Sequence, residues 1–324
     1  MTEPFIDRLA AQVERLESPV VVGLDPRWEE LPLAVRGAGE SWQARATAYM
    51  QFCNAVSDVV APLAPAVKVQ AAFFEELGPA GMAAMADVIA HAHERGLLVI
   101  IDGKRNDIGS TAMAYARGYL GGATKPSPNP SPEGRRSARP AERGRGAWSG
   151  DALTVSPYLG DDSLAPFVEV ANERGAGVFV LVKTSNPGGR MLQDLPVDGE
   201  PLYRRVAAHV EELAAASAGA CGYGSIGAVI GATYPEQLAE LRAAMPHAWF
   251  LVPGYGSQGG TAADVAGGFD ARGLGAIVNN SRGILYAYGR PEYAQRFGAA
   301  RWQDAVDAAT REMIDALRSV IKRS

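Results

Sequence analysis

Short apolar runs recur along the chain and alternate with stretches in which apolar residues follow helical spacing. Eight of the runs are nearly free of polar residues, as is typical of parallel strands covered on both faces. They span residues 19–24, 66–69, 97–101, 152–155, 177–182, 226–230, 249–252 and 276–278. Eight strands alternating with helices predict an α/β fold, a (β/α)8 barrel of the TIM type. A doubly wound sheet would show the same alternation, so the prediction depends on the count of eight.

Three helical stretches are well marked by their periodicity. Near the N-terminus, Phe5, Leu9, Val13 and Leu16 recur at the spacing of an amphipathic helix. A second helix is expected over residues 80–95, ending at Gly96 in the position that favours glycine. A third is expected over residues 302–321 at the other end of the chain.

Residues 121–150 do not fit the alternation. They contain five prolines, four serines and six basic residues against two acidic ones, with almost nothing to bury. We interpret them as a flexible insertion between the helix after strand three and strand four, within a single domain that spans residues 1–324. Because the insertion leads into the start of a strand, we expect it on the face opposite the strand ends. A basic tract could also bind an anionic partner.

Composition argues against a nucleic-acid binder, a disulfide-linked protein and a membrane protein. The chain has 324 residues and a net charge of -5, so it lacks the basic surplus of a nucleic-acid binder. Two distant cysteines argue against a disulfide framework and favour a reducing, cytoplasmic setting. No secretory signal is visible, and the longest uncharged run, residues 213–235, is broken by glycines and is not a membrane span.

Polar residues stand where the predicted strands end. The third strand runs into IDGKRNDIGS, which places Asp102, Lys104 and Asp107 within six positions. Strand residues alternate faces, so Asp102 and Lys104 are expected to point the same way, and Lys68 on the preceding strand could complete an alternating row of charges. Charges clustered at strand ends favour an active site, because buried ions are costly without a function or a partner. A salt-bridge network that merely closes the barrel core is the structural alternative.

Glycine-rich turns follow the last two strands. GYGSQG, residues 254–259, matches the dinucleotide pattern G-x-G-x-x-G, but it lacks the second βαβ half and the acidic residue that this pattern needs. In a barrel, such turns hold a phosphate through backbone N–H groups. Arg282, beside Gly283, would supply the charged contact. The spacing therefore predicts a phosphorylated small molecule as the ligand.

Seven segments together resemble the orotidine 5′-phosphate decarboxylase family, in its longer bacterial and mycobacterial-type group. They are VVGLDPR, VKVQAAFFEELG, VIIDGKRNDIGSTA, LTVSPYLG, VLVKTSNPGG, PGYGSQGG and NNSRGILYA, in this order from Val21 to about Ala287. The resemblance implies a homodimer of barrels with active sites at the subunit interface, no cofactor, and decarboxylation of orotidine 5′-phosphate as the last step of de novo UMP synthesis.

The resemblance also implies roles for the residues at the strand ends. Asp102 and Lys104 would be the central catalytic pair, with Lys104 donating a proton to C6 of the substrate. Lys68 would extend the row of charges and, with Asp25, contact the ribose hydroxyls. Asp107, with Ile108 and Thr111, would reach into the partner subunit's site.

The remaining implied contacts hold the base and the phosphate. Ser185 would bond the pyrimidine edge, and Gln258 would bridge the base and the phosphate. Arg282, with Gly283, would hold the phosphate group.

Three other readings share some of these features. A metal-dependent sugar-phosphate decarboxylase or aldolase of a related barrel family would keep Asp102, Lys104 and Asp107 but would need further acidic ligands. A nicotinamide-dependent oxidoreductase would use residues 254–259. In a non-catalytic barrel, the charges would only support the structure.

Overall fold

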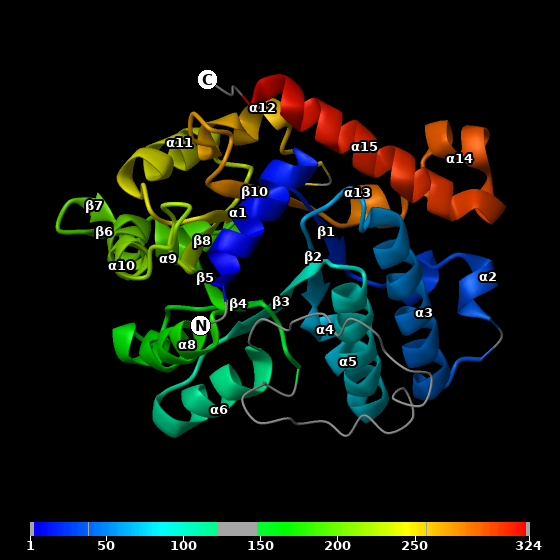
Figure 1. The fold of residues 1–324 in the computed structure, drawn as a ribbon, viewed down its shortest axis with the longest axis horizontal. Coiled ribbons are helices and arrows are strands. Elements are labelled where there is room, and N and C mark those ends of the chain that lie inside the picture. The colour runs from blue at the N-terminus through cyan, green and yellow to red at the C-terminus, as the bar shows by residue number, and fades with distance from the viewer. Residues whose placement is uncertain (1–2, 38, 122–147, 257, 322–324) are drawn as a thin grey trace.

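A closed barrel of eight parallel strands forms the centre of the molecule (Figure 1). The computed structural model describes residues 3–37, 39–121, 148–256 and 258–321. Around the barrel the strands follow chain order, and the eight-stranded barrel predicted from the sequence is confirmed. The strands are β1 (Val20–Leu24), β2 (Ala66–Gln70), β3 (Leu98–Arg105), β4 (Ala152–Val155), β5 (Gly177–Lys183), β8 (Ile226–Ile230), β9 (Phe250–Val252) and β10 (Ala276–Asn280).

Helices surround the barrel, and the three helices expected from periodicity correspond to α1, α5 and α15. A small antiparallel hairpin, β6 (Pro196–Val197) and β7 (Glu200–Pro201), stands apart from the barrel sheet. The helices are α1 (Phe5–Leu16), α2 (Leu33–Arg36), α3 (Trp42–Val60), α4 (Ala71–Glu75), α5 (Gly78–Glu94), α6 (Gly109–Tyr119), α8 (Asp161–Arg174), α9 (Arg190–Gln193), α10 (Leu202–Ala216), α11 (Pro235–Ala244), α12 (Ala262–Val265), α13 (Arg282–Leu285), α14 (Pro291–Phe297) and α15 (Trp302–Val320).

The strands are apolar on both faces because both faces are covered. In β1, Val20 and Val22 pack in the layer between the sheet and the helices, whereas Val21 packs inside the barrel. This alternation is the period of two expected for a strand. A buried charge within a strand, such as Lys68 of β2, is the exception and needs a compensating partner.

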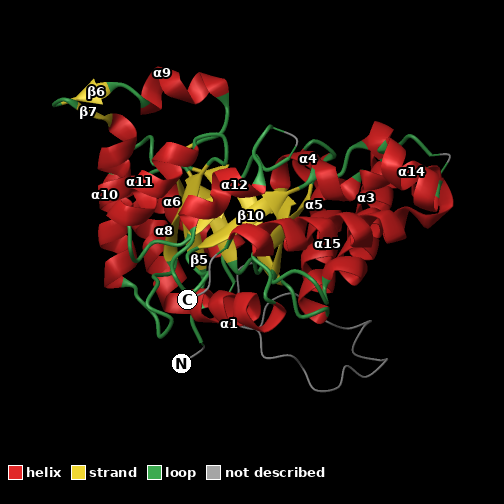
Figure 2. Cartoon of the chain, turned by 90° about the horizontal axis from the view of Figure 1, so that it is seen from above, coloured by secondary structure: helices red, strands yellow, loops and turns green. Residues whose placement is uncertain are grey.

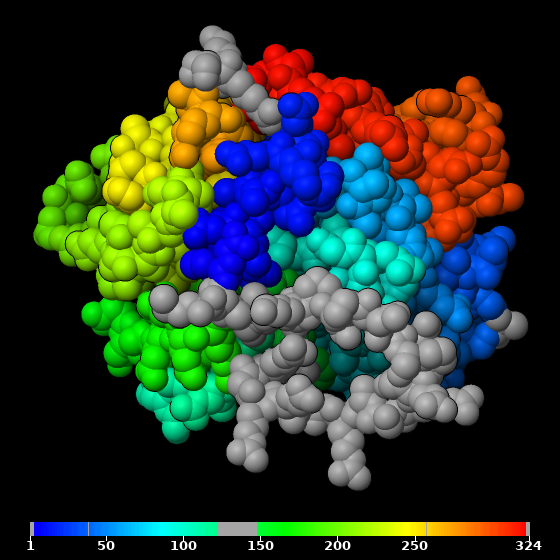
Figure 3. Space-filling model, in the orientation of Figure 1, coloured from blue at the N-terminus to red at the C-terminus, as the bar shows by residue number. Residues whose placement is uncertain are grey.

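Helix α1 closes the N-terminal end of the barrel. Its residues Phe5, Leu9 and Val13 belong to the interior core, where the ring of Phe5 meets that of Phe179 edge to face at 6.1 Å. Gly177 begins β5 at this point, and a Cβ there would lie only 2.3 Å from the Phe5 ring. Figure 3 shows α1, in blue, lying across this face of the molecule. The opposite end, where the strands finish, is therefore the end at which a ligand can enter.

The expected insertion lies mostly outside the described residues, which omit 122–147. Its two ends meet: the Gly121 N–H donates to the carbonyl of Gly150 at 2.9 Å, just before β4 begins. The predicted flexibility of residues 121–150 and the assignment of residues 1–324 to one domain stay predictions. Within the described ranges, no helix combines the length and the apolar character that a membrane crossing requires.

Candidate active site

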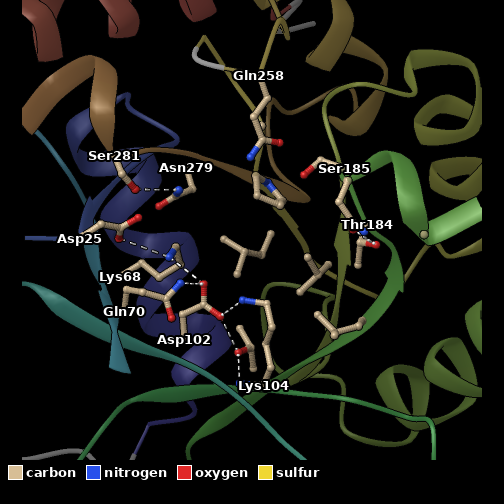
Figure 4. Close-up of a pocket in the computed structure, with 18 of the residues that line it drawn as sticks. Asp25, Lys68, Gln70, Asp102, Lys104, Thr184, Ser185, Gln258, Asn279 and Ser281 are labelled. Atoms are coloured by element: carbon tan, nitrogen blue, oxygen red, sulfur yellow. Dashed lines mark hydrogen bonds and ion pairs between the residues drawn. The ribbon is translucent and has the colours of Figure 1, made fainter. Parts of the chain in front are cut away.

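A cavity of about 530 Å3 opens at the C-terminal ends of the barrel strands. Figure 4 shows polar side chains from several strands pointing into it. The structure brings together here seven of the residues singled out in the sequence, namely Asp25, Lys68, Asp102, Lys104, Ser185, Gln258 and Arg282. It does not bring Asp107, Thr111 or Gly283 to the cavity wall of their own chain.

Four alternating charges cross one side of the cavity. Lys68 Nζ lies 3.8 Å from Asp25 Oδ1 and 2.8 Å from Asp102 Oδ2, and Lys104 Nζ lies 2.6 Å from Asp102 Oδ1. The Lys68 side chain is only 4% exposed, whereas that of Lys104 is 49% exposed. Lys104 is therefore the ammonium that a ligand can reach, and Lys68 is held behind it.

Asp102 is held as a carboxylate. Burial by itself raises its pKa, but the ammonium groups of Lys68 and Lys104 outweigh burial and hold the pKa well below its usual range. Gln70 Nε2 donates a further hydrogen bond to Asp102 Oδ2 at 3.1 Å. For Lys68 the signs are opposite. Burial lowers its pKa, Asp102 and Asp25 raise it, and the net shift of the pKa is upward. Both partners thus stay charged.

The backbone at Lys104 departs from a regular strand. Its φ is +44°, in the left-handed region that costs a residue with a side chain roughly 1–2 kcal/mol, and the pairing of β3 with β4 shifts between Ile101 and Arg105. Thr154 on β4 stabilises this geometry. Its Oγ1 accepts from the Lys104 N–H at 2.9 Å and donates to Asp102 Oδ1 at 2.9 Å. Asp102 and Lys104 do point the same way, through a bulge held by Thr154 and not through simple alternation.

Ser185 and Gln258 lie across the cavity from the charged row (Figure 4). Ser185 follows β5, and Gln258 belongs to the glycine-rich turn after β9. In that turn Gly254 has φ +96°, and a Cβ on it would lie 3.1 Å from Gln258 Oε1 and 3.2 Å from Ser185 Cβ. Glycine at this position therefore allows both polar side chains to approach the same point above β9.

Two buried acceptors face the cavity without a hydrogen-bond donor among the described residues. They are Asp25 Oδ1, whose nearest cation is the Lys68 ammonium 3.8 Å away, and Asn279 Oδ1. The other end of the Asn279 amide donates to Ser281 Oγ at 3.4 Å. Buried acceptors are nearly always satisfied in proteins, so these two are suited to hydroxyl groups of a ligand.

Arg282, the first residue of α13 after β10, stands exposed at the mouth of the cavity. The backbone N–H of Gly283 is directed elsewhere, since it donates to Asn280 Oδ1 at 3.1 Å. A Cβ at Gly283 would lie 2.8 Å from the Asn280 amide, which explains the glycine by close packing.

Asp107 and Thr111 lie outside the cavity, where β3 leads into α6. Asp107 Oδ1 accepts from the N–H of Ile108 at 2.8 Å, and Thr111 is exposed. The Ile108 side chain is 56% exposed, and Tyr158 and Leu159, which follow the neighbouring strand β4, are 72% and 47% exposed. The predicted role of Asp107 and Thr111 in a partner's site stays a prediction.

Sequence reasoning missed several polar residues of the cavity, among them Gln70, Thr154, Gln193 and Asn279. Asn279 stands at the end of β10, so the same strand-end rule that selected Arg282 could have selected it. Thr154 carries no comparable signal, because threonine is an ordinary strand residue. Its role depends on which strand lies beside it.

The arrangement offers one accessible ammonium, a fixed carboxylate beside it, and hydrogen-bonding groups across the cavity. Among the side chains that the structure describes, no group of three or more His, Cys, Asp or Glu is placed to hold a metal ion. Such a site can stabilise a developing negative charge through Lys104 and then transfer a proton to it.

Comparison with known proteins gives consistent results. A family model described as the orotidine 5′-phosphate decarboxylase / HUMPS family matches residues 18–126 and 134–297. The orotidine 5′-phosphate decarboxylase of Rhodopirellula baltica is 54% identical over 316 residues, covering 97% of this chain and 99% of that protein. The one from Deinococcus radiodurans is 39% identical over 310 residues, covering 95% and 99%. The structure of the OMP decarboxylase of Leishmania donovani matches with a TM-score of 0.70 and 31% identity, covering 98% of each chain.

Proposed function

The chain belongs to the orotidine 5′-phosphate decarboxylase / HUMPS family, and on that premise we propose how its cavity decarboxylates orotidine 5′-phosphate to uridine 5′-phosphate and CO2. The reaction makes the protein a carbon–carbon lyase of UMP biosynthesis. The observation that carries the proposed mechanism is the row of Asp25, Lys68, Asp102 and Lys104, with its one accessible ammonium.

Lys104 serves the chemical step. When the bond between C6 and the carboxylate breaks, CO2 leaves and the electron pair stays on C6, in the plane of the ring, where the π system cannot delocalise it. The Lys104 ammonium stabilises this pair electrostatically and then donates its proton to C6. Solvent returns a proton to Lys104, so the reaction consumes one proton in all.

Asp102 and Lys68 keep Lys104 in place. Asp102 accepts from Lys104 at 2.6 Å, and Lys68 neutralises the second oxygen of Asp102 at 2.8 Å. Placed beside the substrate carboxylate, the Asp102 charge also disfavours the ground state relative to the transition state, in which that carboxylate is leaving as neutral CO2.

The rest of the cavity binds the parts of the substrate that do not react. Asp25, with Lys68 behind it, accepts from a ribose hydroxyl, and Asn279 accepts from another. Their Oδ1 atoms accept no hydrogen bond from the described residues, which supports this assignment. Ser185 bonds the pyrimidine edge, Gln258 bridges the base and the phosphate, and the Arg282 guanidinium holds the phosphate. Binding of this remote phosphate supplies interaction energy that is used at the reacting carbon.

A homodimer with shared sites accounts for the remaining predicted residues. Asp107 and Thr111 are outside their own cavity, and the exposed apolar side chains of Ile108, Tyr158 and Leu159 lie on loops after adjacent strands. Placed against a second copy, this surface would bury apolar area and carry Asp107 toward the partner's substrate. Two free cysteines, one of them buried, are in keeping with a cytoplasmic protein.

The test is loss of orotidine 5′-phosphate, followed by absorbance, with and without EDTA. We expect rapid loss by the wild-type protein that the chelator does not slow. Activity that EDTA abolishes and a divalent cation restores, or activity on a sugar phosphate alone, would instead support the metal-dependent alternative.

A further inference from the structure

Lys183 is a buried cation that the proposed chemistry does not use. It is the last residue of β5, and its side chain is only 2% exposed. Leu181, two residues earlier, lines the cavity, but Lys183 does not, because the pairing of β5 with β8 is irregular between these two residues. A buried ammonium is costly unless it is compensated, so its partners indicate what the residue does.

The partners of Lys183 join the barrel to the segment that leaves it. Lys183 Nζ forms an ion pair with Asp194, the residue directly after α9. The ring of Tyr203 on α10 lies 5.2 Å from the ammonium, and the ring of Tyr234, just before α11, lies 4.7 Å from it. The two rings provide cation–π contacts in a desolvated site, where such contacts are strongest. Lys183 therefore links the excursion between β5 and α10, residues 184–201, to α10 and to the start of α11.

Helix α9, which ends at the residue before Asp194, forms part of the cavity wall. Leu192 and Gln193 line the cavity. Gln193 Oε1 accepts from the Thr184 N–H at 3.0 Å, and Gln193 Nε2 donates to Thr184 Oγ1 at 2.8 Å. Thr184 and Ser185 line the same wall (Figure 4). Figure 2 shows α9 and the β6–β7 hairpin projecting from the end of the molecule opposite α1.

We propose that Lys183 and Asp194 are positioning residues for the pyrimidine end of the substrate. Their ion pair fixes α9. The two hydrogen bonds between Gln193 and Thr184 then hold Thr184 and the adjacent Ser185 in position. The inference rests on the proposed function, in which Ser185 bonds the pyrimidine edge. Neither Lys183 nor Asp194 touches the reacting atoms, so the pair affects how tightly the base is held more than how fast the bond breaks.

Asp194→Asn is the most informative variant. It removes the charge without changing the shape, and Asp194 is 39% exposed, so the variant is expected to fold. We expect KM for orotidine 5′-phosphate to rise about 10-fold with kcat changed less than about 3-fold, because a buried charge loses its partner on the binding wall. The inhibition constant of UMP should rise in parallel. That of ribose 5-phosphate, which has no base, should stay within about 2-fold of wild type, a difference that a general loss of structure would not produce.

The same segment provides a matched control. Asp198 in the β6–β7 excursion pairs with Arg205, but both side chains are well exposed, 80% and 53%. Asp198→Asn should leave all three constants within about 2-fold of wild type, as expected for a surface ion pair. Lys183→Met alone and combined with Asp194→Asn completes a double-mutant cycle, in which the double variant should bind UMP no more weakly than Lys183→Met.

An Asp194→Asn protein with wild-type KM and wild-type UMP inhibition would overturn the inference, as would equal weakening of UMP and ribose 5-phosphate. The wild-type protein in the same assay separates this failure from that of the proposed function. If wild type did not decarboxylate orotidine 5′-phosphate, the function itself would be at fault; if wild type is active and Asp194→Asn matches it, only the positioning role is wrong.

Discussion

For Lys104, the side-chain direction expected from the sequence is correct, but the regular strand backbone expected with it is not. Alternation along a regular strand places Asp102 and Lys104 on the same side, and their 2.6 Å contact is as expected. The φ of +44° at Lys104 and the shifted register beside it were not foreseeable, because the sequence DGKRND has no feature that marks a bulge. Strained backbone of this kind is often found at functional sites, where the surrounding contacts hold it.

Thr154 supplies two of those contacts, and its hydroxyl can be removed without changing the size of the side chain. Thr154→Val leaves the Lys104 N–H unpaired and takes one donor from Asp102, each through a lost bond of 2.9 Å. We expect kcat to fall about 10- to 100-fold with little change in KM, since a hydrogen bond to a charged group contributes about 1.5–3 kcal/mol. Thr154→Ser retains the hydroxyl and should remain within about 3-fold of wild type. Steady-state kinetics of the two variants measures this, and a Val variant as fast as wild type would show that the hydroxyl has no part in holding the pair.

Strands were predictable as short, nearly continuous apolar runs, and three of the helices were predictable because their apolar period is repeated over several turns. All eight strands and the helices α1, α5 and α15 correspond to sequence patterns. The excursion with α9, β6 and β7 was not predicted, because its elements are two to four residues long and carry no period. The residues missed in the site follow the same division: Gln193 belongs to this excursion, and Thr154 is visible only once β4 is placed beside β3.

The start of β4 depends on a second buried carboxylate, far from the cavity. Asp151 accepts from Arg8 on α1 at 2.7 Å, from the Val99 N–H on β3 at 2.8 Å, and lies 2.9 Å from His93 on α5. Burial raises its pKa, but His93 and Arg8 outweigh burial and the net shift is downward. Asp151 therefore joins three elements around the closed end of the barrel.

Asp151→Asn should lower the free energy of unfolding at pH 7 by about 3 kcal/mol, because it removes a buried carboxylate from its ion pair with Arg8 and from its contacts with His93 and the Val99 N–H. A lowered folded-state pKa stabilises the protein above the ordinary carboxyl pKa of about 3.9, and that stabilisation is lost as the pH falls through the folded-state value. The difference between wild type and variant should thus shrink in acid. Denaturant unfolding over a pH series measures it.

Asp58, on α3, is a control for this prediction because it also pairs with a histidine of α5. It contacts His91 and Arg95, the same residue types, but its side chain is 45% exposed. Asp58→Asn should cost less than about 1 kcal/mol at pH 7. Equal losses in the two variants would contradict the view that burial makes the Asp151 cluster important.

For the molecule as a whole, the open question is whether two copies share their sites. Lys104→Ala and Asp107→Ala should each be inactive alone, whereas a mixture whose subunits have exchanged should regain about a quarter of wild-type activity. This value follows from random pairing, since half the dimers are mixed and each has one site with both native residues. Two different affinity tags would verify that mixed dimers form. If they form and remain inactive, Asp107 does not act in the partner's site.

The measurement that tests the mechanism most directly compares catalysis and binding in Lys104→Ala. Lys104 is half exposed and leaves Asp102 with three other hydrogen-bond donors, so its removal should preserve the fold. We predict that kcat for orotidine 5′-phosphate falls on the order of 10⁴-fold or more, because both charge stabilisation and the proton donor are lost. Affinity for UMP, measured by calorimetry, should change less than about 10-fold. A Lys104→Ala protein that binds UMP normally and decarboxylates within about 10-fold of the wild-type rate would contradict the central role of this lysine.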